Sequence, residues 1–279
     1  MKKIILFVSA ALLSFGIEAQ IKTPQPSPSS KIEQVVGLTD VTVEYSRPSM
    51  KGRTIFGNLV PYDKLWRTGA NKNTQITFSD DVKIGDAELK KGTYAIFTNP
   101  GKESWEVIFY SDANNWGTPR EWDDSKVAGK VKVKATKIPM NVETFTIMFS
   151  DFTMDSAHLN FIWESTEAAI KLEVPSKKKA MESIETVMAG PSANDHYQAA
   201  VFYKDTEDYA KAKQHIEKAV AGRADAFWYH RQHSLILAKT GDKDGAIKAA
   251  KTSLELAEKA KNADYVKLNK DSLAEWGAK

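Results

Sequence analysis

Hydrophobic and polar residues alternate along most of the chain between residues 41 and 174, and a period of two residues is typical of β-strands. In residues 130–135, KVKVKA, Val131 and Val133 lie on one face and the lysines on the other. Turn-forming pairs such as Gly85-Asp86 separate the segments, and no helical pattern intervenes. Eight or nine short strands of this kind predict an antiparallel β-sandwich or barrel, of which we favour the sandwich. The expected strands are VTVEYS (41–46), QITFS (75–79), TYAIFT (93–98), WEVIFY (105–110), KVKVKA (130–135), ETFTIMF (143–149), HLNFIW (158–163) and AIKLEV (169–174).

The pattern changes at Pro175, after which hydrophobic residues recur with the spacing of α-helices. Ser176 is expected to cap a first helix that carries Met181, Ile184 and Met188 on one face. A glycine followed by a proline, at residues 190–191, is typical of a helix end. The chain therefore divides into a β-sandwich domain, residues 31–175, and a helical domain, residues 176–279.

The helical part repeats itself at an offset of 34 residues, which is the period of tetratricopeptide repeats. Small alanines recur where two helices would approach closely, and a Thr-x-Asp pattern precedes them. We expect two tetratricopeptide-like repeats over about residues 192–260 and a capping helix over residues 262–277; a helical bundle with accidental spacing is the alternative. The matched pairs are Thr206 and Thr240, Asp208 and Asp242, and Ala212 and Ala246.

The first residues have the pattern of a secretory signal peptide. Two lysines precede an apolar stretch of about a dozen residues, which is shorter than the roughly 20 needed to span a bilayer. Cleavage is expected near Ala19, so residues 1–19 form the signal peptide and residues 20–30 a flexible leader rich in proline and serine. The protein is then periplasmic or secreted, with no membrane span in the mature chain; an uncleaved membrane anchor is the alternative.

Composition narrows the function classes. The formal net charge is only +3, with 39 basic and 36 acidic residues, and this balance does not predict a nucleic-acid partner. The chain has no cysteine, which excludes disulfides, thiol catalysis and zinc sites with cysteine ligands. The length allows two domains with sizeable cores.

Motifs that carry chemistry are absent from the sequence. There is no GxSxG elbow, no GxxxxGK[ST] loop, no GxGxxG loop and no HExxH run. His230 and His233 have the spacing of two metal ligands on one helix face, but a zinc site needs further ligands. We predict no catalytic residue, no metal and no cofactor.

Residues 114–124, NNWGTPREWDD, combine aromatic rings with carboxylates. A glycosidase needs two carboxyl groups about 5–10 Å apart, and aromatic rings can support sugars. Trp116, Trp122 and Asp123 are therefore candidate ligand contacts. Catalysis on envelope polysaccharide by Glu121 and Asp123 is an alternative hypothesis, and a tryptophan that plugs the edge of the sandwich is the simpler interpretation.

A second candidate site lies between the first predicted strand and QITFS. Arg53 and Arg67 offer planar guanidinium groups that suit carboxylates or phosphates, and Trp66 can stack beside them. Gly69 and Asn71 tolerate left-handed backbone, so the chain can turn sharply there. The stretch is either the mouth of a ligand site or a structural corner with a buried Trp66.

The same stretch carries a resemblance to a known family. The motifs are Gly52-Arg53, Phe56-Gly57, Val60-Pro61-Tyr62, Trp66-Arg67, Gly69-Ala70-Asn71, Gly92, Tyr94 and Phe97. Over about residues 28–175 the chain resembles the exported bacterial family catalogued as domain of unknown function 2911. The resemblance implies an exported, β-rich domain without an established activity, and tetratricopeptide-like tails are familiar in such proteins.

We therefore expect an exported, non-catalytic binding or scaffold protein. Its helical repeats would bind a protein or peptide partner. Its β-domain would bind a small molecule or glycan through Arg53, Tyr62, Trp66, Arg67, Asn71, Trp116, Trp122 and Asp123. A purely structural scaffold is a further alternative.

Overall fold

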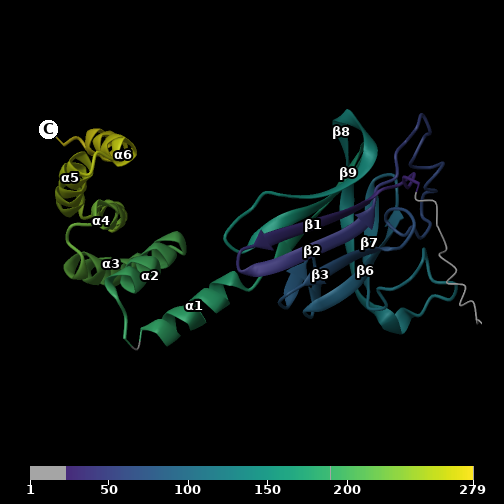
Figure 1. Cartoon of the computed structure of the whole chain (residues 1–279), viewed down its shortest axis with the longest axis horizontal. Helices are drawn as coiled ribbons and strands as arrows, with labels where there is room; N and C mark the ends of the chain where they lie inside the picture. The colour runs from purple at the N-terminus through teal and green to yellow at the C-terminus, as the bar shows by residue number, and fades with distance from the viewer. Residues whose placement is uncertain (1–22, 189, 279) are drawn as a thin grey trace, which may run out of the picture.

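A computed structural model describes residues 23–188 and 190–278 of the chain. In these ranges nine strands precede six α-helices, and the change from strands to helices occurs at Pro175 (Figure 1). The order predicted from the sequence, strands first and helices afterwards, is confirmed. The predicted signal peptide, residues 1–19, lies outside the described residues. No helix in the described ranges is both long and apolar enough to cross a bilayer.

Short connections join most of the strands and helices, and the two long connections are residues 47–73 and 111–123. The strands are β1 (Ser29–Val36), β2 (Thr39–Ser46), β3 (Thr74–Phe78), β4 (Val82–Ile84), β5 (Ala87–Leu89), β6 (Gly92–Pro100), β7 (Ser104–Tyr110), β8 (Val127–Ser150) and β9 (Ser156–Glu173). A short 3₁₀ turn, η1 (Asp124–Lys126), precedes β8. The helices are α1 (Ser176–Val187), α2 (Ala193–Asp205), α3 (Tyr209–Gly222), α4 (Phe227–Lys239), α5 (Lys243–Lys259) and α6 (Ala263–Glu275).

The strands form one hydrogen-bonded sheet in the order β1-β2-β3-β6-β7-β8-β9-β4-β5, and every pair is antiparallel. All eight expected strands are present, but residues 130–135 and 143–149 belong to the single strand β8. Residues 158–163 and 169–174 likewise fall almost entirely in β9. The register between β8 and β9 shifts twice, between Lys137 and Thr146, so the long pair bends while it stays paired.

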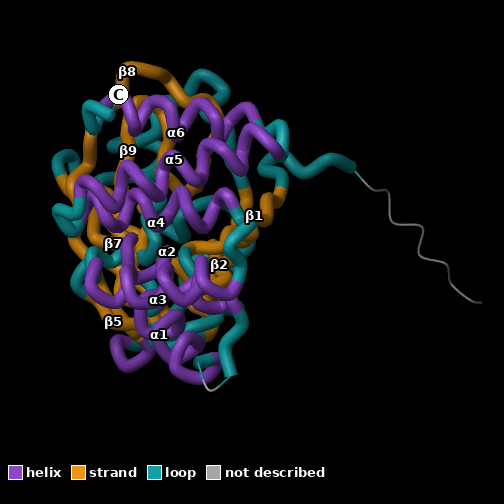
Figure 2. The backbone as a smooth tube through the Cα atoms, turned by 90° about the vertical axis from the view of Figure 1, so that its left-hand side faces the viewer, coloured by secondary structure: helices purple, strands orange, loops and turns teal. Residues whose placement is uncertain are grey.

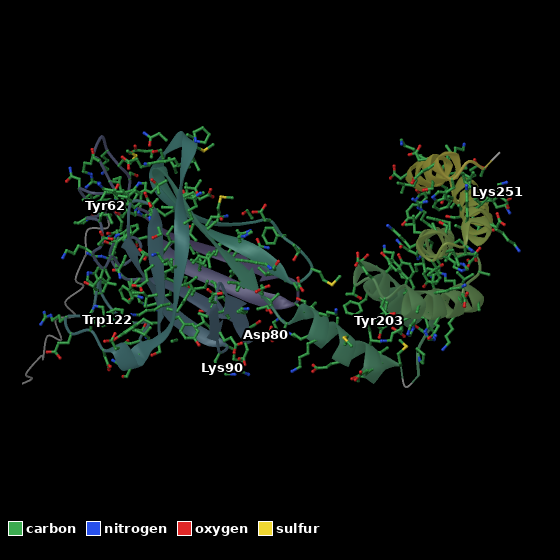
Figure 3. All side chains as sticks on the ribbon, turned by 180° about the vertical axis from the view of Figure 1, so that it is seen from behind. Tyr62, Asp80, Lys90, Trp122, Tyr203 and Lys251 are labelled. Atoms are coloured by element: carbon green, nitrogen blue, oxygen red, sulfur yellow. The ribbon has the colours of Figure 1, made fainter. Side chains whose placement is uncertain are left out.

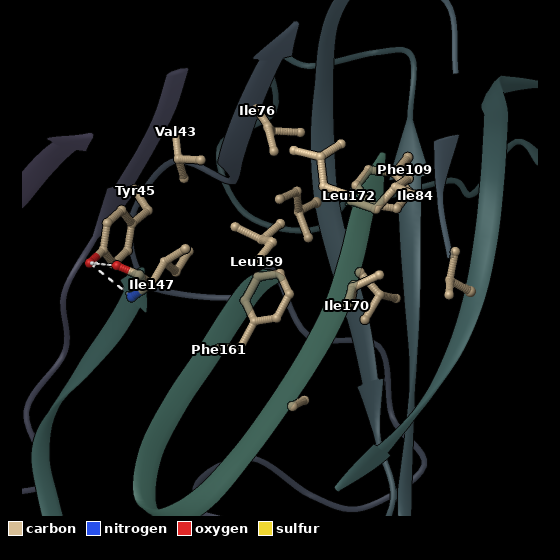
Figure 4. Close-up of a cluster of buried hydrophobic side chains, with 14 of the residues drawn as sticks. Val43, Tyr45, Ile76, Ile84, Phe109, Ile147, Leu159, Phe161, Ile170 and Leu172 are labelled. Atoms are coloured by element: carbon tan, nitrogen blue, oxygen red, sulfur yellow. Dashed lines mark hydrogen bonds between the residues drawn. The ribbon is translucent and has the colours of Figure 1, made fainter. Parts of the chain in front are cut away.

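The concave face of the sheet encloses the main hydrophobic core. Side chains of β2 and β3 face those of β9 across this space, as Figure 4 shows for Val43, Ile76 and Leu159. The Tyr45 hydroxyl on β2 accepts a hydrogen bond from Ile147 N–H on β8 at 3.0 Å and so joins distant parts of the sheet (Figure 4). Because the alternating positions point inward, their burial provides the main stabilisation of this part of the chain.

A smaller apolar cluster covers the opposite face of β6 and β7. Phe97 and Tyr110 are fully buried there, and Trp122 packs on them with ring centroids 5.6 Å and 4.6 Å away. The segment before β8 therefore closes the outer face of the sheet. Strand β6 is buried on both faces for this reason.

The helices after α1 form two hairpins, α2–α3 and α4–α5, followed by α6, and Figure 2 shows them as successive rows. Positions 34 residues apart have equal roles in the two hairpins. Thr206 and Thr240 are the C-caps of α2 and α4, while Asp208 and Asp242 cap α3 and α5 by accepting backbone N–H bonds. The sequence repeat thus corresponds to a repeated helix pair.

Helix α1 is attached to the β1–β2 turn. Pro175 is its N-cap, and Ser176, which the sequence analysis expects as the cap, is the first helical residue. The Ser176 hydroxyl instead accepts a hydrogen bond from Leu38 N–H at 3.0 Å. A Cβ on Gly37 would lie 1.8 Å from Ser176 Oγ, so only glycine fits against the helix start.

Strand β1 begins at Ser29, inside the segment expected to be a flexible leader, residues 20–30. The backbone of Arg47 donates to Pro28 O at 2.9 Å, which ties the end of the leader to β2. Alternation is hard to detect here because polar residues occupy this edge strand and only Val36 is buried. Strands β4 and β5 also escape detection, since three residues each are too short to establish a period.

Candidate functional site

The connection from β2 to β3, residues 47–73, forms a corner of the sheet. Its backbone pairs with β6 at Trp66, whose N–H donates to Thr98 O at 2.7 Å and whose carbonyl accepts from Thr98 N–H at 2.9 Å. A second bridge joins Phe56 to Val60. These contacts hold an irregular segment against the sheet and fix the direction of its side chains.

Trp66 is half-buried at the end of the main core. Its indole stacks on Trp163 with ring centroids 5.8 Å apart and an interplanar angle of 19°. Phe145 lies edge-on at 5.1 Å, and the indole N–H donates to Gly69 O at 3.1 Å. The ring is therefore fixed by packing and by a hydrogen bond, while part of its surface remains open to solvent.

The turn that follows Arg67 is built from residues with a left-handed backbone. The φ angles of Thr68, Gly69 and Asn71 are 57°, 150° and 58°. Such angles are rare for a residue with a branched Cβ, and strained residues cluster at functional sites. Thr68 is held in this conformation because it is fully buried and its hydroxyl donates to Thr98 Oγ1 at 3.1 Å.

Asn71 connects this turn to two other segments. Its side-chain amide donates to Ser27 O at 3.2 Å and to Ser46 Oγ at 3.3 Å. Its backbone carbonyl accepts from Arg67 Nη1 at 2.9 Å. One residue thus fixes the start of the folded chain and the guanidinium group of Arg67.

The guanidinium of Arg67 has unused hydrogen-bond donors. In the described part of the chain, its Nε and Nη2 make no hydrogen bond, and no carboxylate lies within 4.0 Å of it. Gly117 packs directly on the group, since a Cβ at this position would lie 3.2 Å from Arg67 Nη1. The left-handed φ of Gly117, 95°, allows this close approach.

Arg53 is held by backbone carbonyls. Its Nε donates to Met50 O at 2.8 Å and its Nη2 to Ser49 O at 2.7 Å. Among the described residues, Arg53 has no acidic partner either, so its charge is not neutralised locally. Its Nη1 remains free to bind another group.

The loop that carries Trp116 is anchored by the buried amide of Asn73. Asn115 N–H donates to Asn73 Oδ1 at 2.8 Å, and Asn73 Nδ2 donates to Ala113 O at 3.0 Å. The backbone N–H of Asn73 also donates to Asn115 O at 3.1 Å. The loop therefore has a fixed base, while the Trp116 side chain is 79% exposed, the most exposed large hydrophobic side chain in the described ranges.

The β2–β3 connection, together with Ser27, Trp116 and Trp163, encloses a pocket of about 430 Å³, which we call the Trp-Arg pocket. Its volume lies within the range of about 300–1,000 Å³ typical of small-molecule sites. No acidic residue lines it. Five of the eight candidate residues from the sequence line the pocket: Arg53, Trp66, Arg67, Asn71 and Trp116.

Tyr62, Trp122 and Asp123 do not line the pocket. Tyr62 packs beside Gly57, with the ammonium of Lys102 5.8 Å from its ring centroid, and Trp122 packs on the cluster at the outer face of the sheet. Figure 3 labels both residues, which lie apart from each other. Asp123 is exposed and caps η1. Hydrogen bonds from the hydroxyl and the backbone N–H of Ser125 lower the pKa of Asp123 below its ordinary value.

Two residues of the site are missed by the sequence reasoning. Trp163 lies on β9 and forms part of the pocket wall, but its strand pattern indicates only a core position. Gly117 belongs to a glycine-containing loop, and nothing in the sequence places it against Arg67. In both cases the contact joins segments far apart in the chain.

His230 and His233 share no hydrogen-bond partner among the described residues. His230 Nε2 is 2.8 Å from the carbonyl oxygen of Ala224. His233 Nε2 is buried without a hydrogen bond, and burial lowers the pKa of this residue. Across residues 23–188 and 190–278, no three side chains of His, Asp or Glu come together as a metal site would require.

Comparison with models of protein families identifies the family of the chain. A family model described as "Protein of unknown function (DUF2911)" matches residues 27–172, more than half of the chain. The matched region includes every residue of the Trp-Arg pocket and ends before α1. No curated protein matches the chain.

Proposed function

The chain belongs to the DUF2911 family of proteins of unknown function, and from the pocket within its family region we propose that it is an exported, non-catalytic binding protein. Its curved sheet is a β-sandwich module that binds a small molecule or glycan in the Trp-Arg pocket. Its helical hairpins are tetratricopeptide-like repeats that bind a protein or peptide. Export rests on the signal-peptide pattern of residues 1–19.

One observation carries the proposal for the sheet. Two arginines without an acidic partner among the described residues line the same pocket as three tryptophans. Arg67 is partly buried, and a buried charge usually pairs with a carboxylate because it has lost solvation, whereas Arg53 is exposed and stays solvated. An open guanidinium fork beside aromatic rings is the arrangement that recognises a ligand with a negative group.

A hollow on the helical part supports the second binding role. It has a volume of about 450 Å³ and is lined by residues of α2, α3, α4 and the end of α6. Tyr209, Leu235 and Trp276 give it apolar surface, while Lys204, Lys239 and Glu275 line it with charges of both signs. Stacked helix pairs commonly bind peptides on such a concave surface.

The alternative hypothesis is an enzyme that acts on polysaccharide, and neither Glu121 nor Asp123 has the properties of its general acid. A glycosidase needs one carboxyl group with a raised pKa. Glu121 and Asp123 are both exposed, and the pKa of Asp123 is lowered rather than raised. The alternative of a scaffold without a ligand does not account for the polar groups that line the Trp-Arg pocket.

Replacing Arg67 tests the proposal for the sheet. We expect Arg67→Ala to abolish the thermal shifts that small molecules or glycans cause in the wild-type protein. The free energy of unfolding should fall by only about 1 kcal/mol, because one hydrogen bond to Asn71 O is lost. Arg120→Ala is the matched control, since Arg120 is an exposed arginine that does not line the pocket. A screen in which no compound shifts the wild-type melting temperature would contradict the proposal.

A substitution in the helical hollow tests the other binding role. We expect the wild-type protein to retain a partner from an envelope extract in a pull-down, and Leu235→Glu to lose it. The buried face of α4 would stay intact, because Leu235 is only partly buried. Equal capture by both proteins would place the partner surface elsewhere.

A further inference from the structure

The Trp-Arg pocket has chemistry that selects one class of ligand, and we propose that it binds an acidic saccharide, a sugar ring that carries a carboxylate. This inference rests on the proposed binding function of the sheet and specifies its ligand. The recognition has three parts: an anion site at Arg67, an aromatic platform at Trp116, and polar groups at the pocket edge.

The anion site is the free edge of Arg67. Only Nη1 of this guanidinium is hydrogen bonded within the described residues, to Asn71 O, and Gly117 packs on the group, so the two contacts together orient it. The remaining donors, Nε and Nη2, lie on one edge and match the two oxygens of a carboxylate. Arg53 supplies a second positive charge from a side chain that two backbone carbonyls hold in place.

The platform is Trp116. A tryptophan that is 79% exposed loses hydrophobic stabilisation unless something covers it, and this one lines a pocket rather than standing alone on the surface. Its loop is anchored through Asn73, and the adjacent Gly117 packs on Arg67. A ligand held by the arginine therefore lies beside the indole, where the apolar C–H face of a sugar ring can stack.

The polar edge favours a saccharide over a nucleotide. Ser27 and Asn71 line the pocket, where the Ser27 hydroxyl can donate or accept and Asn71 Oδ1 can accept from a sugar hydroxyl, since the Asn71 amide donors are already used. The pocket lacks the arrangement that binds nucleotide phosphates, because the residues that line it belong to no helix and to no glycine-rich phosphate loop. Trp66 and Trp163 stack on each other, so they do not form an open slot into which a base could insert.

Calorimetric titration of the full chain with digalacturonate tests this inference. The comparison probes are its methyl ester, which has the same rings without the charge, inorganic sulfate and AMP. We expect digalacturonate to bind and to change the tryptophan fluorescence. The methyl ester should bind about 10- to 100-fold more weakly, the ratio expected for lost charge-assisted hydrogen bonds.

Variants identify the groups responsible. Arg67→Gln should weaken the binding of digalacturonate to the level of its ester, and Arg67→Lys should restore part of the affinity at most. Trp116→Ala should weaken both saccharides and remove the fluorescence change. Because Trp116 is so exposed, this variant should fold even if a substitution of Arg67 does not. Arg120→Gln should bind like the wild-type protein.

Each other outcome overturns the inference. Equal affinity for the ester, or binding of sulfate or AMP as tight as that of digalacturonate, would show another ligand class and leave the proposed binding function intact. Unchanged affinity in Trp116→Ala would remove the platform. If no probe binds and a thermal-shift screen of neutral and cationic compounds is also empty, the proposed binding function fails together with the inference.

Discussion

Trp66 combines two roles that the sequence presents as alternatives. Its indole is packed against Trp163 and Phe145, as expected for a structural corner, and the same side chain lines the Trp-Arg pocket. Arg67 differs from the corner hypothesis, because it binds the backbone carbonyl of Asn71 instead of a carboxylate. A rigid ring beside an open guanidinium is well suited to ligand binding, since little conformational entropy is lost on association.

Asn73 is the residue on which the Trp116 loop depends. Only 2% of Asn73 is exposed, and its side chain bonds both Asn115 N–H and Ala113 O. We expect Asn73→Ala to lower the free energy of unfolding by about 1–3 kcal/mol, because buried polar groups lose their partners. Urea denaturation measures this change. Lys64→Ala, at an exposed residue of the same β2–β3 connection that makes no hydrogen bond or ion pair among the described residues, should change it by less than about 0.5 kcal/mol. Equal effects of the two substitutions would contradict the anchoring role.

A histidine pair makes stability depend on pH. His196 Nδ1 and His215 Nδ1 are 3.0 Å apart on α2 and α3, so at least one ring must be neutral. Burial is the main cause that lowers the pKa of both residues. For His215 the charge of His196 comes next, followed by Lys218 and Lys211; for His196, Lys218 adds to the effect of burial and Asp195 opposes it. A lowered pKa in the folded state means that the unfolded chain binds more protons below about pH 6.5.

The contribution of this pair to the free energy of unfolding is therefore fully present above about pH 6.5, and it is lost as the pH falls toward the lowered pKa values. We expect the urea midpoint of the helical transition, followed by circular dichroism, to fall between pH 7.5 and pH 5. The double variant His196→Gln/His215→Gln should weaken this dependence and keep the part due to His233, whose pKa burial also lowers. A wild-type midpoint that does not change over this range would disprove the assignment.

At the residue level, the sequence predicts the part of the site that is local in the chain. Arg53, Trp66, Arg67 and Asn71 are close in sequence, so turn chemistry and side-chain type suffice to group them. Trp122 and Asp123 are predicted as ligand contacts together with Trp116, yet they lie outside the pocket. Trp122 packs on Tyr110 and Phe97 at the outer face of the sheet. The spacing of Trp116 and Trp122 in the sequence does not show which of the two lies at the outer face and which lines the pocket.

The secondary structure elements show what periodicity can and cannot predict. Alternation identifies the longer strands that have a buried face, but not the three-residue strands β4 and β5 or the polar edge strand β1. It does not predict that residues 130–149 continue as one strand, because Pro139 normally ends a strand. The register shifts between β8 and β9 accommodate this proline in a bulged stretch, so the pair remains continuous.

The two aspartate caps test the equivalence of the helical hairpins. Asp208 accepts from Lys211 N–H at 3.2 Å, and Asp242 accepts from Gly245 N–H at 2.9 Å. We expect Asp208→Ala and Asp242→Ala each to cost about 0.5–2 kcal/mol in the free energy of unfolding of the helices. Circular dichroism at 222 nm during urea denaturation provides the measurement.

A third aspartate gives the control for the cap variants. Asp225 is 82% exposed at its side chain and caps no helix, so Asp225→Ala should change stability by less than about 0.5 kcal/mol. If only one of the two cap variants is destabilised, the hairpins are not equivalent, despite the repeat in the sequence.

The whole molecule contains separate hydrophobic cores. The clusters of the sheet and of the helical hairpins share no residue, and α1 lies between them (Figure 1). Lys179 on α1 binds Asp80 at 2.8 Å and Leu38 O at 2.9 Å, so this helix is fastened to the sheet. The hairpins have no comparable attachment to the strands among the described residues.

We therefore expect two unfolding transitions. Five of the seven tryptophans lie in the β-domain, so fluorescence follows mainly the sheet, whereas circular dichroism at 222 nm follows mainly the helices. The midpoints of the two signals in urea should differ, because each core can unfold alone. Coincident midpoints at all temperatures would indicate that the two parts unfold as one cooperative unit.

Helix α1 also determines how the two ends of the molecule face each other. Its twelve residues advance about 18 Å, and every residue added within it would turn the hairpins by about 100°. Two extra residues would thus rotate the hollow of the helical part to nearly the opposite side, while seven would lengthen the spacing and almost restore the original angle. If one large ligand binds the Trp-Arg pocket and the helical hollow at the same time, its affinity should rise and fall periodically as residues are added to α1. If the two sites bind separate ligands, the length of α1 should not change either affinity.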